Sequence, residues 1–407
     1  MSRNAADVLV IGGGIMGTSA ALFLARRGKS VILLESDLIG RQASGTNFGN
    51  VRRQGRPLHQ MDLANRAREI WWRLPELIGE DCELVKRGHL RVATTPDLAA
   101  AMAGYAAEAQ HAGLDLELIS GNTLHDRFPF LGPDAVAGSF SPLDGHANPR
   151  LTGPAFGRAA VRAGAVLHEN ARAIAATRTG EDFEVALADG RRFRAPILLI
   201  TAGAWSARFA EGFGDAAPLQ VMGPQMTVTE PLPYVIGPST SVSTPEADHS
   251  IYFRQVARGN IVIGGPRRNA VSLAFGHARV DPANILIQLD RAQKLLPLIR
   301  NARIIRSWSG VESYTPDEDP IIGQSPRVAG LYYAFGFSGS GFQLGPGVGD
   351  VIAELIATGR SPISLAPYTP ARFPAEMEAG AATVPGEAMR GQPIPPASRT
   401  EPDRCPP

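Results

Sequence analysis

Apolar residues near the start of the chain predict two strands separated by a helix. Residues 7–11 form a largely apolar run, a glycine-rich turn follows, and a helical pattern then continues until Gly28. A second run over residues 30–34 ends in Glu35. Short continuous apolar runs are typical of strands that are buried on both faces of a sheet. The pattern therefore predicts a βαβ unit.

Later segments predict strands of two kinds. Residues 197–200 form another continuous apolar run, which is typical of a buried strand. Alternation of apolar and polar residues predicts strands in two further groups. The first group suits hairpins and comprises residues 166–174, 184–187 and 192–195. The second group suits an antiparallel sheet in a second domain and comprises residues 225–229, 250–255 and 260–264.

Proline and glycine indicate the ends of further helices. Pro57 opens one helix, which reaches Trp72, and another covers residues 151–163. The last organised helix begins at Pro346 and stops at Gly359. Proline is favoured in the first turn of a helix and glycine after the last turn, which explains these bounds. We interpret Trp72 and its neighbour Trp71 as packing residues.

These elements predict an α/β protein of two discontinuous domains, because 407 residues exceed the usual size of one domain. A Rossmann-type domain is expected beside a second domain with a mainly antiparallel β-sheet. Residues 366–407 are rich in proline, alanine and glycine and predict a disordered tail. The expected boundaries are 1–85, 145–215 and 305–365 for the first domain, and 86–144 and 216–304 for the second.

The glycines after the first strand predict a site for an adenine dinucleotide. Gly12 permits a tight turn, Gly14 lets the backbone approach a pyrophosphate, and Gly17 lets the helix pack closely on the sheet. N–H groups at the start of the helix then face the phosphates. Glu35 follows Gly17 by eighteen residues, where it accepts hydrogen bonds from ribose hydroxyls and repels a 2′-phosphate. NADP is therefore disfavoured.

Composition excludes several classes of partner. A net charge of +1 gives no electrostatic sign of binding to nucleic acid or to an anionic membrane. Cys82 and Cys405 are too few for a disulfide framework or a zinc site, so we expect neither a disulfide nor a metal. No apolar run approaches the length of a membrane span, and the first strand leaves little room for a leader. We expect a cytoplasmic protein.

Four segments resemble the D-amino-acid oxidase superfamily of FAD enzymes, which includes glycine oxidase, sarcosine oxidase and the flavin subunits of hydroxyproline and opine dehydrogenases. The resemblance covers about residues 6–362. It implies FAD rather than NAD, because a second glycine-rich segment far along the chain holds an isoalloxazine. The four segments are residues 12–17 with Glu35, 43–49, 201–206, and 315–342. Residues 47–55 and 308–310 look most like the opine and hydroxyproline dehydrogenase branch.

The resemblance also implies the residues that bind FAD. N–H groups around Gly341, Phe342 and Gln343 are expected to face the pyrimidine edge of the flavin, at the positive end of the following helix. The cysteine that tethers flavin in sarcosine oxidases falls on Gly310, so FAD is expected to be non-covalent. The full set of expected contacts is Gly12, Gly14, Ile15, Met16, Gly17, Glu35, Ser44, Gly45, Thr46, Asn47, Gly49, Ala173, Gly203, Gly310, Gly339, Ser340, Gly341, Phe342 and Gln343.

The usual anchors of the substrate carboxylate are replaced in this chain. The lysine of sarcosine oxidase relatives falls on Gln343, and the arginine of glycine oxidase relatives falls on Glu312. Arg52 is then a candidate anchor, and we expect its neighbour Arg53 to point elsewhere. Tyr252 and Arg254 share one face of a predicted strand, and a guanidinium fork matches a carboxylate. Alternatively, Glu312 recognises a basic substrate group or is a structural carboxylate. The candidate catalytic residues are Arg52, Tyr252, Arg254, Glu312 and Gln343.

The function that follows is hydride transfer from an amino or imino acid to flavin N5. The substrate is a D-amino acid, an N-alkyl glycine, a cyclic imino acid or an opine. The lysine that assists reaction with oxygen aligns near Val262, which favours a dehydrogenase over an oxidase. His59 and His146 are alternative general bases.

Two other functions stay open: a non-catalytic or electron-relay flavin subunit, and an NAD-dependent dehydrogenase that rests on the first motif alone. The expected partners are the substrate, oxygen or another electron acceptor, and further subunits in a homo- or hetero-oligomer.

Overall fold

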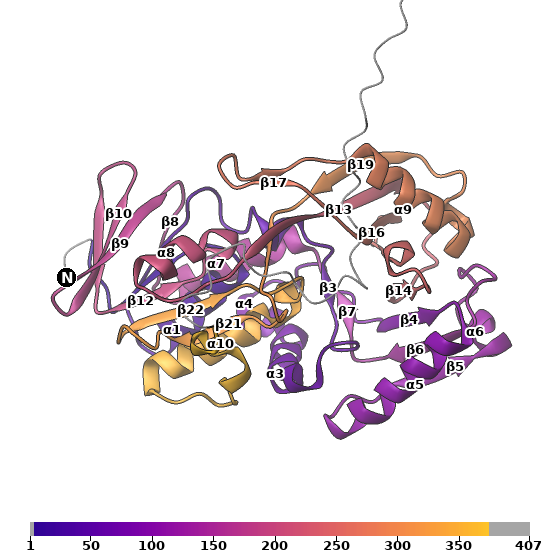
Figure 1. Cartoon of the computed structure of the whole chain (residues 1–407), viewed down its shortest axis with the longest axis horizontal. Coiled ribbons are helices and arrows are strands. Elements are labelled where there is room, and N and C mark those ends of the chain that lie inside the picture. Colours follow the sequence, from indigo (N-terminus) through magenta and orange to yellow (C-terminus); the bar gives the residue numbers. More distant parts are fainter. Residues whose placement is uncertain (1–3, 374–407) are drawn as a thin grey trace, which may run out of the picture.

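The computed structural model describes residues 4–373, and its parallel sheet contains the predicted βαβ unit (Figure 1). The strand order is β21-β22-β12-β1-β2-β8, in which all neighbours are parallel except β21 and β22. Every residue of β1 and β2 is buried, as their apolar sequences predict. The strands are β1 Val8–Ile11, β2 Val31–Leu34, β8 Val166–His168, β12 Ile197–Ile200, β21 Ile321–Gln324 and β22 Leu331–Phe335.

Alternate residues of this sheet enter two separate cores. Val8 and Val10 pack in a core formed mainly by helices, whereas Leu9 and Ile11 pack with a three-stranded sheet and α8. The helices that contribute most residues to the first core are α1 Ile15–Arg26, α3 Met61–Trp72, α7 Pro149–Arg162 and α10 Gly341–Thr358. The second core contains β9 Ala173–Thr179, β10 Asp182–Leu187, β11 Arg192–Ala195 and α8 Ala207–Gly212.

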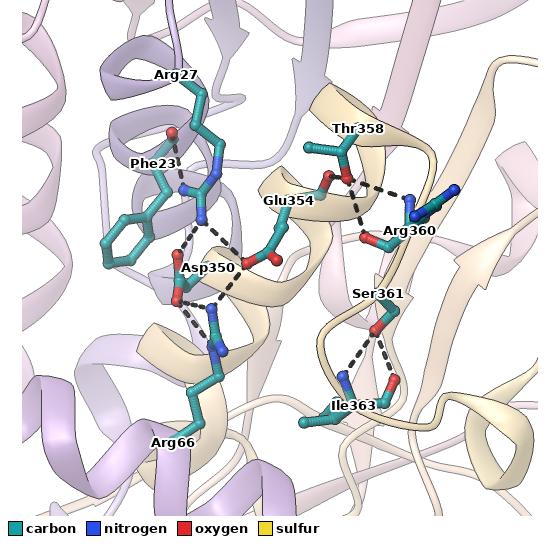
Figure 2. Close-up of polar contacts among 9 residues, drawn as sticks. All are labelled: Phe23, Arg27, Arg66, Asp350, Glu354, Thr358, Arg360, Ser361 and Ile363. Carbon is teal, nitrogen blue, oxygen red and sulfur yellow. Dashed lines mark hydrogen bonds and ion pairs between the residues drawn. The ribbon is translucent and has the colours of Figure 1, made fainter.

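Ion pairs connect three helices of the first core on their outer side (Figure 2). Asp350 on α10 accepts hydrogen bonds from Arg27, which follows α1, at 2.7 Å and from Nε of Arg66 on α3 at 2.8 Å. Glu354, one turn further along α10, accepts from the same two arginines at 3.4 and 2.9 Å. Segments far apart in the sequence are therefore held together at one place.

A nine-stranded sheet forms the other half of the molecule (Figure 1). The strand order is β19-β13-β16-β15-β14-β4-β6-β5, with β20 on β13, and only β4 and β14 are parallel. Its apolar face, including Leu90 and Phe253, packs against α6 and α9. The strands are β4 His89–Ala93, β5 Glu117–Ser120, β6 Ala137–Ser141, β13 Gln220–Pro231, β14 Ser239–Ser243, β15 Ile251–Gln255, β16 Asn260–Asn269, β19 Ile304–Ser309 and β20 Glu312–Tyr314.

The described chain has five further α-helices and four further strands. They are the helices α2 Ala43–Thr46, α4 Leu74–Ile78, α5 Pro96–His111, α6 Gly121–Arg127 and α9 Pro282–Leu295, and the strand pairs β3 Asn50–Val51 with β7 Gly145–His146 and β17 Val271–Ser272 with β18 His277–Ala278. Within residues 4–373, none of the helices has the length and apolar character that crossing a membrane requires. The predicted α/β fold class is confirmed, and the division into two domains stays a prediction.

The structure corrects several predicted bounds. The range 166–174 is not one hairpin strand: β8 joins the parallel sheet, Asn170 turns the chain at φ +51°, and β9 then starts the small sheet. The helix predicted from Pro57 begins at Met61, after a short 3₁₀ turn over Leu58–Gln60. The last helix begins at Gly341, so Pro346 lies inside it and forgoes a backbone hydrogen bond.

The predicted disordered tail begins too early. Residues 366–373 include two 3₁₀ turns, Ala366–Tyr368 and Pro370–Arg372. Tyr368 is buried, and Arg372 pairs with Asp317 at 2.7 Å. The rest of the predicted tail lies outside the described residues, as does Cys405.

Candidate active site

A cavity of about 1000 Å³ runs from the carboxyl ends of β1, β2 and β12 to the polar face of the nine-stranded sheet. Gly12, Glu35 and Gly203 line it at the parallel sheet, and Tyr252 and Arg91 line it at the other sheet. Ligands of open α/β sheets bind beyond the carboxyl ends of the strands. The cavity therefore lies where the first glycine motif predicts a dinucleotide.

The glycine loop after β1 is too crowded for side chains. Gly12 has φ +109°, and a Cβ there would lie 2.5 Å from the carbonyl oxygen of Thr201. A Cβ on Gly17 would lie 2.0 Å from the carbonyl oxygen of Gly12. Gly14 precedes α1 and lines the cavity. The loop therefore brings the backbone and the positive end of α1 to the cavity wall.

Glu35 holds the end of β2 against this loop. Its carboxylate accepts from the N–H of Gly13 at 2.6 Å, from the N–H of Asp37 at 2.9 Å, and from the hydroxyl of Ser36 at 3.0 Å. The residue is buried but still lines the cavity. These bonds fix an anionic acceptor where ribose hydroxyls are expected.

The late glycine block lines the cavity beside the start of α1, where a Cβ on Gly341 would lie 3.1 Å from Cε of Met16. Gly339, Ser340 and Gly341 line the cavity at the start of α10, with Phe342 directly after them. The first N–H groups of a helix lack partners within it, and the helix dipole makes this end positive. The cavity is therefore electropositive where the chain begins α10.

Most predicted cofactor contacts line this cavity, and four do not. Gly17, Gly45, Thr46 and Gly310 lie behind the wall, where they pack. A Cβ on Gly45 would lie 2.3 Å from the carbonyl oxygen of Gly40, and one on Gly310 would lie 2.4 Å from Oγ1 of Thr46. The residues that do line the cavity are Gly12, Gly14, Ile15, Met16, Glu35, Ser44, Asn47, Gly49, Ala173, Gly203, Gly339, Ser340, Gly341, Phe342 and Gln343.

Tyr252 lines the cavity, but Arg254 does not. The ring of Tyr252 packs edge-on against Phe48 at 4.8 Å between centroids. The guanidinium of Arg254 is buried behind this pair, where Nε donates to the carbonyl of Phe48 at 2.5 Å. Burial lowers the pKa of Arg254 to about 10. Arg254 therefore positions the Phe48 segment, and the prediction that it anchors a carboxylate is not supported.

The Gln343 side chain also has a positioning role. Its Nε2 donates to the carbonyl of Ala64 on α3 at 2.9 Å, and the backbone carbonyl of Gln343 accepts from Nε1 of Trp71 at 2.8 Å. Gln343 and Trp71 are almost completely buried. Gln343 therefore joins α10 to α3, and the interpretation of Trp71 as a packing residue is confirmed.

Neither candidate histidine lines the cavity. His59 is largely exposed and contacts Asp319 at 2.8 Å. His146 is buried, and burial followed by the charge of Arg254 lowers its pKa well below the ordinary value. The hypothesis of a histidine base is therefore not supported by the geometry.

One arginine of the early doublet faces the cavity, as expected. Arg52 lines it, whereas Nε of Arg53 pairs with Asp144 at 3.3 Å in a buried position. Successive residues of an extended segment point to opposite sides, which separates the two guanidinium groups.

Sequence reasoning missed Arg268, which lines the cavity from β16. Its Nε donates to the hydroxyl of Tyr314 at 2.9 Å, and this hydroxyl donates to Oε2 of Glu312 at 3.0 Å. Nη1 of Arg268 donates to the carbonyl of Gly265 at 2.9 Å, and this carbonyl also accepts from the hydroxyl of Tyr252. The four side chains therefore form one half-buried cluster at the cavity.

Charge in this cluster is nearly balanced. Burial raises the pKa values of Glu312 and Tyr314. Burial alone lowers the pKa of Arg268, but Tyr314, Tyr252 and Glu312 together raise it above the ordinary value. The geometry supports Glu312 as a structural carboxylate that holds Arg268 rather than as a partner for a basic substrate group.

Comparison with known proteins decides the family. The sequence model of the family described as FAD dependent oxidoreductase, abbreviated DAO, matches residues 7–355. The chain belongs to this family. The family resemblance seen in the sequence is confirmed, as are the expectations of an enzyme and of FAD as its cofactor.

Individual relatives cover nearly the whole chain. Glycine oxidase of Geobacillus kaustophilus is 28% identical over 372 residues, which are 89% of this chain and 96% of the relative. A subunit of the opine oxidase of Rhizobium meliloti is 28% identical over 382 residues, 91% of this chain and 98% of the relative. Among solved structures, L-proline dehydrogenase of P. horikoshii has a TM-score of 0.85 and 25% identity, and the match covers 91% of this chain and 98% of that one.

The cavity fits FAD at both ends. The glycine cradle after β1 leaves no room for Cβ atoms, and Glu35 supplies an acceptor for the adenosine ribose. When bound, FAD accepts a hydride from a reduced substrate. The start of α10 supplies positive potential where negative charge then develops. That FAD is held without a covalent bond stays a prediction.

Proposed function

We propose that this flavoenzyme oxidises the C–N bond of an amino or imino acid, with Arg268 holding the substrate carboxylate. The substrate loses a hydride from its α-carbon and a proton from its nitrogen, and becomes an imine. D-amino acids, N-alkyl glycines, cyclic imino acids and opines all have this chemistry. The names of the relatives, a glycine oxidase, an opine oxidase subunit and a proline dehydrogenase, support this class.

The observation that carries the proposal is the position of Arg268. Its guanidinium lines the cavity within a hydrogen-bonded cluster whose other members include Tyr252 and Glu312. A guanidinium matches a carboxylate in shape and charge. Arg268 thus supplies, from another strand, the anchor that the resemblance leaves missing at Glu312 and Gln343.

The rest of the wall fits hydride transfer from a neutral amine. Phe48, Met226 and Tyr252 line the cavity between Arg268 and the parallel sheet. These side chains exclude water from the part of the cavity where the amine would lie. Because Arg268 fixes the substrate carboxylate, it also orients the α-carbon for hydride transfer.

We propose a dehydrogenase rather than an oxidase. Val262, where related oxidases have a lysine, is buried in a small apolar cluster with Phe48 and Met226. A positive charge that stabilises superoxide is therefore missing at this position. The substrate electrons then pass to an acceptor other than oxygen.

The first test is anaerobic mixing of the purified flavoprotein with a panel of amines. D-amino acids, sarcosine, proline derivatives and opines are each added while the flavin absorbance is followed. We expect bleaching by at least one class of amine, which then names the substrate. A folded, FAD-saturated protein that no member of the panel bleaches contradicts the proposal.

A second candidate function is a flavin subunit that relays electrons for a partner. The similarity to the opine oxidase subunit, over 98% of its length, favours it. The same panel separates the two candidates, because a relay protein is not reduced by any amine when the partner is missing. Such a protein would still be reduced by a chemical electron donor.

A further inference from the structure

Three arginines converge on the cavity near the start of α10, where Nη2 of Arg56 donates to the carbonyl of Ser340 at 3.2 Å. A Cβ on Gly55 would lie 2.9 Å from Nη1 of Arg91 and 3.3 Å from Nη1 of Arg52. Nε of Arg56 donates to the carbonyl of Arg52 at 3.1 Å. Arg52, Arg56 and Arg91 all line the cavity, so we call them the arginine triad.

Carboxylates of the chain do not neutralise the arginine triad. Within residues 4–373, none of the three forms an ion pair with an aspartate or a glutamate. Asp144 acts on Arg52 and Arg56 only at a distance, because it already accepts from Nε of Arg53 and from two backbone N–H groups. The triad is therefore an excess of positive charge beside a cavity.

Partial burial makes this excess costly, because Arg56 is buried and Arg52 and Arg91 are half-buried. Burial, followed by the charge of Arg52, lowers the pKa of Arg56 to about 9. Burial and the charge of Arg91 lower the pKa of Arg52. The nearby ring of His89 gives no compensation, because burial and the charges of Arg52 and Arg91 lower its pKa and keep it neutral. Unpaired buried charges are unfavourable, so an anion at this place would stabilise the folded protein.

The sheet fixes how far the triad lies from Arg268. Arg91 on β4 is opposite Ser241 on β14, which is opposite Tyr252 on β15, and all three line the cavity. Neighbouring strands lie about 4.8 Å apart, so Arg91 and Tyr252 are roughly 10 Å apart along the sheet. Tyr252 shares the carbonyl of Gly265 with Arg268. Arg91 of the triad therefore lies at one end of this row, and Arg268 lies beside Tyr252 at the other end.

We propose that the substrate is an amino or imino acid with a second carboxylate, and that the arginine triad binds this second carboxylate. The inference rests on the proposed function, in which Arg268 holds the α-carboxylate. Two guanidinium groups at opposite ends of the row match two carboxylates that a short chain separates. The amine between them then lies along the wall that Phe48 and Tyr252 form.

The test compares pairs of molecules that differ only in the second charge. The holoenzyme is titrated with glutarate and with its monoamide, and the binding is followed as a change in the flavin spectrum. Iminodiacetate and its monoamide are then compared as reductants under anaerobic conditions. We expect the diacid of each pair to bind at least about tenfold more tightly than its monoamide.

Variants assign this preference to the triad. Arg91→Gln is expected to reduce the ratio between diacid and monoamide to about one, whereas Arg91→Lys keeps part of it. If Arg91→Gln does not fold, Arg52→Gln replaces it and is expected to reduce the same diacid-to-monoamide ratio to about one. Arg127→Gln is the matched control, because Arg127 is exposed, pairs with Glu117 and lies outside the cavity. This control should keep the wild-type ratio.

Several outcomes would overturn the inference. Equal binding of diacid and monoamide to the wild type excludes a second carboxylate site. If Arg91→Gln loses FAD but keeps the diacid-to-monoamide ratio, the triad binds the cofactor instead of a second carboxylate. If inorganic phosphate competes as strongly as glutarate, the triad is a general anion site rather than a site for a carboxylate.

Failure of the proposed function would look different. In that case glutarate still binds preferentially, but no amine of the panel reduces the flavin. Conversely, amines that reduce the flavin without any preference for a diacid leave the proposed function intact and contradict the triad.

Discussion

At the residue scale, the anchor that we propose for the substrate is a side chain that the sequence did not single out. Arg268 follows Pro266, which interrupts the alternation of the strand that begins at Asn260. The bulge between β13 and β16 at this point lets the chain turn Arg268 toward Tyr314. By contrast, Arg254 fits the alternation pattern, but its Nε donates a hydrogen bond to the carbonyl of Phe48.

Replacement of Arg268 tests this assignment. Arg268→Met should lower kcat/KM for the identified amine by about 100-fold, because a charged hydrogen bond to a carboxylate contributes about 1.5–3 kcal/mol. Arg268→Lys should recover part of the loss. Steady-state kinetics at fixed FAD saturation provide the measurement.

The neighbouring arginine is the control for this variant. Arg267 does not line the cavity, and it offers its backbone carbonyl to Nη1 of Arg268. Arg267→Met should keep kcat/KM close to the wild-type value. An equal loss of kcat/KM in Arg267→Met and Arg268→Met, or no loss of kcat/KM in either variant, would contradict the proposed role of Arg268.

At the scale of elements, α10 connects the cofactor end of the cavity to the rest of the fold. Its first residues line the cavity, and further along the helix Asp350 forms ion pairs with Arg27 and Arg66. Gly347 approaches Ala67 on α3 so closely that a Cβ would lie 2.8 Å from the Ala67 side chain. The helix start is thereby held in a fixed direction, which its electrostatic role requires.

Removing one charge from this network should loosen α10. Asp350→Asn keeps the shape of the side chain, but it weakens contacts to two arginines in a partly buried position. We expect a loss of about 1 kcal/mol in the free energy of unfolding, seen as a thermal midpoint a few degrees lower. Glu76→Gln is the control, because Glu76 and its partner Arg73 are both exposed. A wild-type midpoint for Asp350→Asn would show that the network contributes little.

At the scale of the whole molecule, the cavity lies where the parallel sheet meets the polar face of the nine-stranded sheet. The first sheet and α10 supply the residues that we propose hold FAD, and the second sheet supplies Tyr252, Arg268 and, from β4, Arg91 of the arginine triad. A substrate bound between them is shielded from water. Val262 packs with Phe48 and Met226, which line the cavity, in a small apolar cluster.

This arrangement predicts slow reaction with oxygen. We expect air to reoxidise the substrate-reduced enzyme at least about tenfold more slowly than an artificial acceptor such as a phenazine does. The reason is that a positive charge that stabilises superoxide is missing. Stopped-flow mixing of the same reduced sample with each oxidant measures both rates. Reoxidation by air at the rate of substrate turnover would identify an oxidase.

The sequence by itself determined the parallel core and the dinucleotide end of the cavity. Strand, turn, helix and acid are consecutive there, so the backbone at Gly12 and the carboxylate of Glu35 follow from local rules. The tertiary structure alone decided which arginines line the cavity. Arg91, Tyr252 and Arg268 come together through pairing of β4, β14, β15 and β16, and strand register depends on long-range packing that no local pattern encodes.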